Sequence, residues 1–167
     1  PFHLIVMDDS TPDMDGGTDL TPEWFARFAK ANPNVTFIHS DMPYRTSIAL
    51  LKQALSHCQT PYVGQIVNSV IVEPDWDVAA LELLKKIPNA GIVGFKALRY
   101  GTQLIESAGM GTQEDGNTIV DLNRSQSGNR HMMVYDCDAV QGALWLGKKD
   151  CLSSACNGNL AIYNGFK

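Results

Sequence analysis

The chain has 167 residues, enough for one domain with a core of its own. Its composition is 44% hydrophobic and 19% charged, and its net charge is −5 with no Lys/Arg cluster, so nucleic acid is not an expected partner. It contains no apolar run of about 20 residues and no signal-like start, so we expect a soluble, cytoplasmic protein without a membrane span. Because the chain begins at Pro1 rather than Met, we expect a piece of a longer protein or a processed chain.

The first hundred residues alternate apolar runs with amphipathic segments. Thr21 is expected to cap the first helix, which ends near Asn32 and has one apolar face made of Trp24, Phe25, Phe28 and Ala29. Glu73 and Asp75 are expected at the N-terminus of the third helix, in a capping and dipole role. This alternation predicts an α/β fold in which parallel strands are joined by right-handed crossovers. The expected strands are HLIVM (3–7), VTFIH (35–39), TPYVGQIV (60–67) and AGIVGFKAL (90–98), and the expected helices are 21–32, 46–58 and 74–87.

The rest of the chain has weaker signals. We expect residues 99–130 to form an exposed, irregular excursion with short extended pieces at 103–107 and 117–122. Residues 132–149 predict one or two further strands. The cysteines lack the paired spacing of a zinc site, so reduced thiols are expected, with a Cys151–Cys156 bridge as the alternative in an oxidising compartment. The histidines also lack metal-ligand spacing.

Polar pairs follow two of the expected strands: Asp8-Asp9 after the first and Asn68-Ser69 after the third. In open α/β sheets, ligands bind outside the carboxyl ends of the strands. Carboxylates there accept hydrogen bonds from a ribose and hold a divalent ion against a diphosphate, as a nucleotide-sugar site requires. The alternative is that the acidic residues solvate a loop and cap the next helix. The glycine-rich fingerprints of dinucleotide and phosphate-loop sites are absent from the sequence, as is a nucleophile elbow.

A resemblance is carried by the segments HLIVMDDSTPDMDGG (3–17), NVTFIH (34–39), TPYVGQIVNSVIVEPDW (60–76), AGIVGFKALRYGTQLIESAGMG (90–111), DAVQGALWLGKKD (138–150) and YNGFK (163–167). In this order, they resemble the family 2 glycosyltransferases, which are inverting enzymes of GT-A fold, and in particular their rhamnosyltransferase-like branch. The resemblance implies one GT-A-like domain over 1–167, with an open, mostly parallel sheet flanked by helices. Residues 1–98 would be the nucleotide-binding half and 99–167 the acceptor-side half; the family's first strand would precede Pro1 and its catalytic acidic segment would follow Lys167.

The same resemblance implies roles for particular residues. Asp8 and Asp9 would contact the uracil or ribose of a nucleotide-sugar donor. Asn68 and Ser69 fall on the family's metal motif, with Ser69 in place of the Asp that binds Mg²⁺ or Mn²⁺. The segment that lines the acceptor side is Gln141, Gly142 and Ala143.

These observations favour a glycosyltransferase-like domain that transfers, or descends from enzymes that transfer, a sugar from a nucleotide diphosphate to an acceptor hydroxyl with inversion. Its partners would be the nucleotide sugar and a glycan or glycoconjugate acceptor, with a divalent ion if it is active. The alternative is a non-catalytic pseudoenzyme that serves as a binding or structural module of a larger assembly, because a neutral Ser69 is a poor ligand for a hard cation. A nucleotidyltransferase is a third option, weakened by the missing glycine-rich loop.

Overall fold

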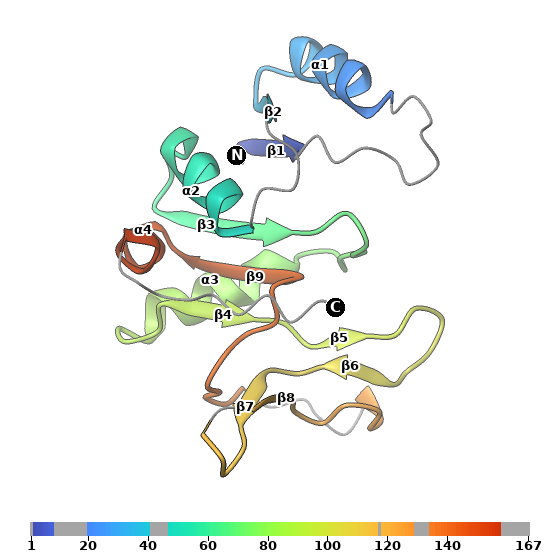
Figure 1. Cartoon of the computed structure of the whole chain (residues 1–167), viewed down its shortest axis with the longest axis vertical. Coiled ribbons are helices and arrows are strands. Elements are labelled where there is room, and N and C mark those ends of the chain that lie inside the picture. Colours follow the sequence, from blue (N-terminus) through green and yellow to red (C-terminus); the bar gives the residue numbers. More distant parts are fainter. Residues whose placement is uncertain (1, 9–19, 41–46, 117, 129–133, 158–167) are drawn as a thin grey trace. The chain divides into compact units, whose positions relative to one another are not determined.

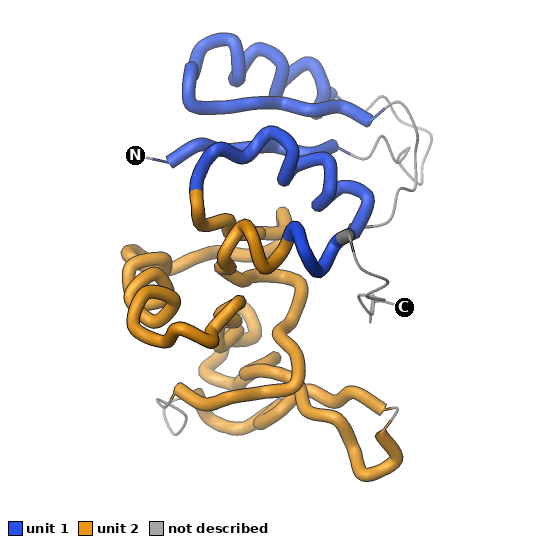
Figure 2. The backbone as a smooth tube through the Cα atoms, turned by 90° about the vertical axis from the view of Figure 1, so that its left-hand side faces the viewer, with its two compact units in different colours: residues 1–60, 153–167 blue, residues 61–152 orange. Residues whose placement is uncertain are grey.

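The computed structural model describes residues 2–8, 20–40, 47–116, 118–128 and 134–157. It divides into two compact units, one formed by 1–60 with 153–167 and the other by 61–152 (Figure 2). One boundary falls between residues 60 and 61, and the other falls inside helix α4 (Lys149–Asn157), which was not among the expected elements. The functional halves expected from the resemblance do not coincide with these units and stay a prediction.

The first unit contains a parallel strand pair with its crossover helix. Strand β1 (Leu4–Asp8) pairs with β2 (Val35–His39) in parallel, in a register that runs from Leu4 opposite Val35 to Asp8 opposite His39. Helix α1 (Thr21–Ala31) connects the two strands, and α2 (Ser47–His57) follows β2. The expected βαβ arrangement is therefore confirmed for this part of the chain.

Helix α1 differs from its prediction in two details. The Leu20 carbonyl already accepts the Trp24 N–H at 3.1 Å, so Leu20 is the N-cap, and Thr21 lies inside the helix. The expected single apolar face is divided: Phe25 stacks on Phe37 of β2 with 5.8 Å between ring centroids, whereas Trp24 stacks on Phe28 and stays 51% exposed. Only part of this face packs against the sheet.

The second unit is built around a three-stranded antiparallel sheet. Strand β9 (Leu144–Lys148) lies between β3 (Tyr62–Ile66) and β4 (Ile92–Gly94) and is antiparallel to both (Figure 1). Strands β3 and β4 therefore run parallel to one another, and helix α3 (Trp76–Lys86) connects them. The core of this unit forms where Ala80 and Leu84 of α3 pack against Leu146 of β9.

The expected strand over 90–98 is two strands in the structure, because its ends have different partners. Strand β4 pairs with β9, whereas β5 (Ala97–Leu98) pairs with β6 (Ile105–Ser107). A second antiparallel pair joins β7 (Met110–Thr112) to β8 (Ile119–Asp121). The prediction of an exposed, irregular excursion over 99–130 is wrong here, since Ile105 and Ser107 are both fully buried.

The turn between β5 and β6 explains how this region folds back. The Arg99 carbonyl accepts the Thr102 N–H at 3.0 Å, and Gly101 has φ +71°, a left-handed conformation that glycine adopts without steric cost. The Arg99 N–H in turn donates to the Leu104 carbonyl at 2.9 Å. The glycine after Tyr100 thus permits a tight hairpin where composition suggested a loop.

Two further expectations concern local chemistry. Asp75 is the N-cap residue of α3, with φ +57°, so its expected place at the helix N-terminus is confirmed. Its side chain makes no capping hydrogen bond to the helix, and Asp77 supplies the acidic first turn. The four cysteines are free thiols, so the alternative bridge between Cys151 and Cys156 is not formed.

The strand pairings bear on the expected sheet. Among the described residues, one of the five pairings between named strands is parallel, that of β1 with β2, and the other four are antiparallel. The chain is mixed α/β, while the open, mostly parallel GT-A-like sheet stays a prediction. Within the described ranges, the helices are all too short or too polar to cross a membrane.

Leu84 offers a direct test of the second unit's core. It is 1% exposed and packs with Ala80 and Leu146, so Leu84→Ala should leave a cavity and lower the free energy of unfolding by about 2–5 kcal/mol. Urea denaturation would measure the loss. The control is Val78→Ala on the same helix, where the side chain is 49% exposed and the loss should stay below about 1 kcal/mol. Equal losses in the two variants would contradict the packing described.

Candidate functional site

Asp8 lies at the carboxyl end of β1, beside the end of β2. Its Oδ2 is 2.8 Å from Nδ1 of His39, the residue opposite it in the parallel register. The Asp8 side chain is 14% exposed, and its backbone carbonyl accepts the N–H of the buried Ser40 at 2.9 Å. The imidazole and the strand end thus orient a partly buried carboxylate at the edge where the resemblance expects a nucleoside contact. Asp9 lies outside the described residues.

Asn68 and Ser69 form the two central positions of a β-turn that follows β3. The Val70 N–H donates to the Val67 carbonyl at 3.1 Å, which closes the turn. Both central side chains are exposed. Asn and Ser are common turn residues, so their local role accounts for the polar step at the strand end, and it leaves both side chains accessible to a ligand.

The end of β3 is joined directly to the segment that precedes β9. The Val67 N–H donates to the Ala143 carbonyl at 3.0 Å, and Nε2 of Gln65 donates to the Gly142 carbonyl at 2.6 Å. A Cβ added to Gly142 would meet no atom within 4 Å, so the space over this residue is open. The segment that leads into the turn of Asn68 and Ser69 is therefore hydrogen-bonded to Gly142 and Ala143 of the expected acceptor side.

The segment that precedes β9 also packs against the end of β4. Val140 packs so closely on Gly94, the last residue of β4, that a Cβ added there would lie 2.7 Å from the Val140 Cγ1. Lys96 follows two residues after Gly94, and its Nζ donates to the Gly128 carbonyl at 2.8 Å. We call this end of the sheet the carboxyl edge and define it by Asn68, Ser69, Lys96 and Gln141.

Sequence reasoning named three members of the carboxyl edge and missed Lys96. Lys96 could have been found from its position just after the fourth expected strand. The run AGIVGFKAL is continuous in the sequence, however, so the end of that strand at Gly94 could not be recognised. Asp8 belongs to the first unit and the carboxyl edge to the second, so each is described within its own unit.

The donor atoms at the turn decide whether a divalent ion fits. Asn68 offers an amide oxygen and Ser69 a hydroxyl, and neither carries the negative charge that offsets Mg²⁺ or Mn²⁺. The carbonyls of Gly142 and Ala143 already accept hydrogen bonds. Across the described ranges, no group of three or more His, Cys, Asp and Glu side chains is placed to hold a metal. The residues described at this edge therefore do not fit the metal that the resemblance implies.

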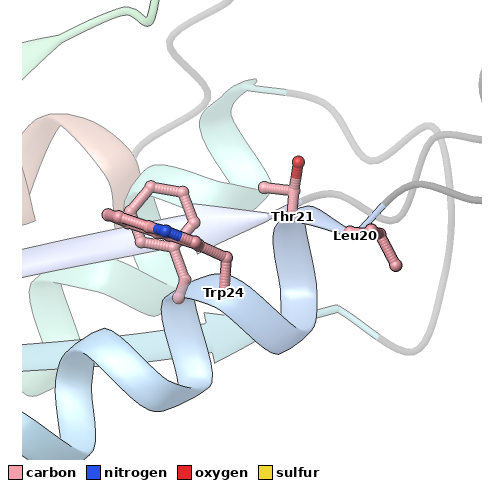
Figure 3. Close-up of a pocket in the computed structure, with 4 residues that line it drawn as sticks. Leu20, Thr21 and Trp24 are labelled. Carbon is pink, nitrogen blue, oxygen red and sulfur yellow. The ribbon is translucent and has the colours of Figure 1, made fainter.

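A separate shallow cavity of about 300 Å³ lies at the start of α1, lined by Leu20, Thr21, Trp24 and Phe25 (Figure 3). Leu20 and Trp24 extend to opposite sides of Thr21. No residue predicted to bind donor or acceptor lines this cavity, and the sequence indicated Trp24 and Phe25 only as part of an apolar helix face.

A charged cluster joins the β5–β6 hairpin to the segment after β8. Nε of Arg99 donates a hydrogen bond to one carboxylate oxygen of Glu106 at 2.5 Å. Nη2 of Arg124 donates to the other oxygen at 2.6 Å. Nη2 of Arg99 also donates to the Ser125 hydroxyl at 3.1 Å. The hydrogen bond from Arg99 and the positive charge of Arg124 lower the pKa of Glu106, outweighing the opposing effect of burial.

This lowered pKa predicts a pH-dependent contribution to stability. Because the folded-state pKa lies below the unfolded value, the contribution is complete above the unfolded pKa and is lost as pH falls through the folded pKa. Glu106→Gln should therefore lower the melting temperature at neutral pH and make little difference at a pH of about 2. The control is Glu82→Gln, which breaks an exposed i,i+4 pair with Lys86 and should change little at any pH. A Glu106→Gln effect that did not vary with pH would contradict the assignment.

Comparison with protein-family models and with curated proteins finds no match for this chain. The family resemblance therefore rests on the ordered segments of the sequence. What it implies for function becomes a proposal, to be judged with the geometry of Asp8 and of the carboxyl edge.

Proposed function

We propose that this chain is a glycosyltransferase-like domain that binds a nucleotide-diphosphate sugar. It transfers, or descends from enzymes that transfer, the sugar to an acceptor hydroxyl with inversion. The supporting observation is the pair of hydrogen bonds from Gln65 and Val67 to the carbonyls of Gly142 and Ala143. A transferase must hold donor and acceptor side by side, and these bonds join the segments to which the two roles were assigned.

The carboxylate of Asp8 supports the nucleoside part of the proposal. An ionised carboxylate accepts hydrogen bonds from ribose hydroxyls and from the imino N–H of uracil or thymine. The contact with His39 orients this group in advance, which reduces the entropy lost when a ligand binds. Asp8 of the first unit is thus proposed to recognise the nucleoside.

A second candidate function follows from the turn chemistry. Asn68 and Ser69 are both neutral and do not fit a divalent ion, and none of the described residues is assigned as general base. A non-catalytic GT-A-like domain, which binds a sugar or a protein within a larger assembly, needs neither feature. This candidate predicts binding of nucleotide or glycan without turnover of a nucleotide sugar.

Nucleotide binding tests the proposal, with UDP and dTDP titrated by calorimetry in the presence of Mn²⁺. We expect measurable heat with at least one nucleotide at millimolar concentration or below. Asp8→Asn should weaken binding about tenfold or more, because the amide replaces a charged acceptor by a neutral one. Asp150→Asn, on the first turn of α4, is the control and should bind as the wild type does.

Two results would count against this assignment. Absence of heat with both nucleotides would contradict nucleotide-sugar binding itself. Equal affinities of the Asp8→Asn and Asp150→Asn variants would remove Asp8 from the nucleoside contact while leaving nucleotide binding in place.

A further inference from the structure

Strand β1 of the first unit has one edge that faces no other strand in the described ranges. The Leu4 N–H donates to the Asn34 carbonyl at 2.9 Å, and the Asp8 carbonyl accepts the Ser40 N–H at 2.9 Å, so residues 4, 6 and 8 make the ladder to β2. The residues between them direct their backbone groups to the opposite side, because alternate residues of a strand bond to the same neighbour. The N–H and C=O groups of Ile5 and Met7 therefore point away from β2, and no described residue bonds to them.

This free edge lacks the features that usually prevent pairing with another chain. Protected edges carry a lysine, a proline or a β-bulge. Residues 4–7 are Leu, Ile, Val and Met, and their register with β2 runs without a bulge. The opposite edge of the sheet, along β2, is less open, because the Val35 N–H already donates to the Asn32 carbonyl at 3.0 Å.

The sheet at this edge also lacks a closed core. No residue of β1, α1 or β2 is buried, whereas α3 in the second unit buries Ala80 and Leu84. Helix α1 packs on β2 through Phe25, and α2 contacts β1, but both leave the strand residues partly exposed. A third strand would pair the free backbone groups and remove further apolar surface from water.

A second copy of β1 has the groups that fit this edge. In an antiparallel pair centred on Val6, Ile5 lies opposite Met7 of the second copy, and Met7 lies opposite its Ile5. Each such pair exchanges two N–H···O=C bonds, so the outward groups of all four residues are satisfied. A two-fold interface of this kind uses the same surface on both copies and closes at the dimer.

The charge of Asp8 favours the antiparallel direction. Parallel, in-register pairing would place Asp8 beside Asp8 of the second copy, and like charges directly opposite one another are destabilising. In the antiparallel pair, Asp8 lies opposite Leu4 of the second copy, so the two carboxylates are separated by the length of the strand. The uncharged residues Ile5, Val6 and Met7 then form the centre of the interface.

We propose that the free edge of β1 is a self-association surface, on which β1 of a second copy adds in the antiparallel direction, centred on Val6. The two strand pairs then form one four-stranded sheet across two chains. Main-chain hydrogen bonds provide the recognition, as in other cases of strand addition at a sheet edge. Association requires no nucleotide, so this surface goes beyond the proposed function.

The test measures sedimentation of the whole chain from micromolar to millimolar concentration, together with amide hydrogen exchange. Met7→Pro removes the outward N–H and keeps the ladder to β2, since that N–H points away from β2. Met7→Ala is the matched control, because it shortens the same side chain and keeps the N–H. Thermal unfolding of each variant monitors the fold.

The wild type should sediment as a dimer at the highest concentrations and as a monomer on dilution. Met7→Pro should raise the dimer dissociation constant about tenfold or more, because both copies lose the hydrogen bond that Met7 donates. Met7→Ala should associate more tightly than Met7→Pro. In the wild type, protection of the Ile5 and Met7 amides from exchange should rise with protein concentration, while that of Val6 is already present in the monomer.

The other outcomes contradict the proposal at separate points. A wild type that stays monomeric at every concentration would overturn self-association. Equal association of folded Met7→Pro and Met7→Ala would place the interface elsewhere, and growth beyond the dimer would contradict a closed pair. Protection of Ile5 and Met7 that does not depend on concentration would assign the edge to another segment of the same chain. None of these results bears on UDP or dTDP binding, which tests the proposed function separately.

Discussion

Insertion of β9 between β3 and β4 is the constraint on which the second unit depends. Its backbone hydrogen bonds fix two parallel strands on either side of one antiparallel strand, and Leu146 of β9 completes the core beneath α3. Because β9 runs against its neighbours, its first residues lie where theirs end. The carboxyl edge follows from this pairing: a turn, a lysine and a polar segment, far apart in the chain, lie at one end of the sheet.

The chemistry of that edge differs from the chemistry implied by the family resemblance. An acidic motif would bring a divalent ion, which would then neutralise a diphosphate. Here the turn carries an amide and a hydroxyl, and neither bears the negative charge that offsets a divalent ion. The Ser69 hydroxyl can both donate and accept a hydrogen bond, so its chemistry is compatible with an anion as well as with a neutral ligand.

The sequence predicted elements well where local periodicity and packing agree. The apolar run of β2 and the amphipathic pattern of α2 each gave bounds within one residue of the structure. The sequence-based prediction failed where strand pairing depends on residues far apart in the chain. The run AGIVGFKAL forms two strands because Gly94 pairs with Trp145 whereas Ala97 pairs with Ser107. The contact between Gln65 and Gly142, 77 residues apart, is not encoded in any local pattern, and neither is the position of Lys96 beside it.

The most direct measurement is a titration of ¹⁵N-labelled protein with UDP in EDTA, followed by NMR chemical shifts. The account predicts that the largest shifts in the second unit fall on the amides of Asn68, Ser69 and Gln141 to Ala143. Shifts confined to the cavity at Leu20, Thr21, Trp24 and Phe25 would contradict the proposal that the carboxyl edge takes part in nucleotide binding.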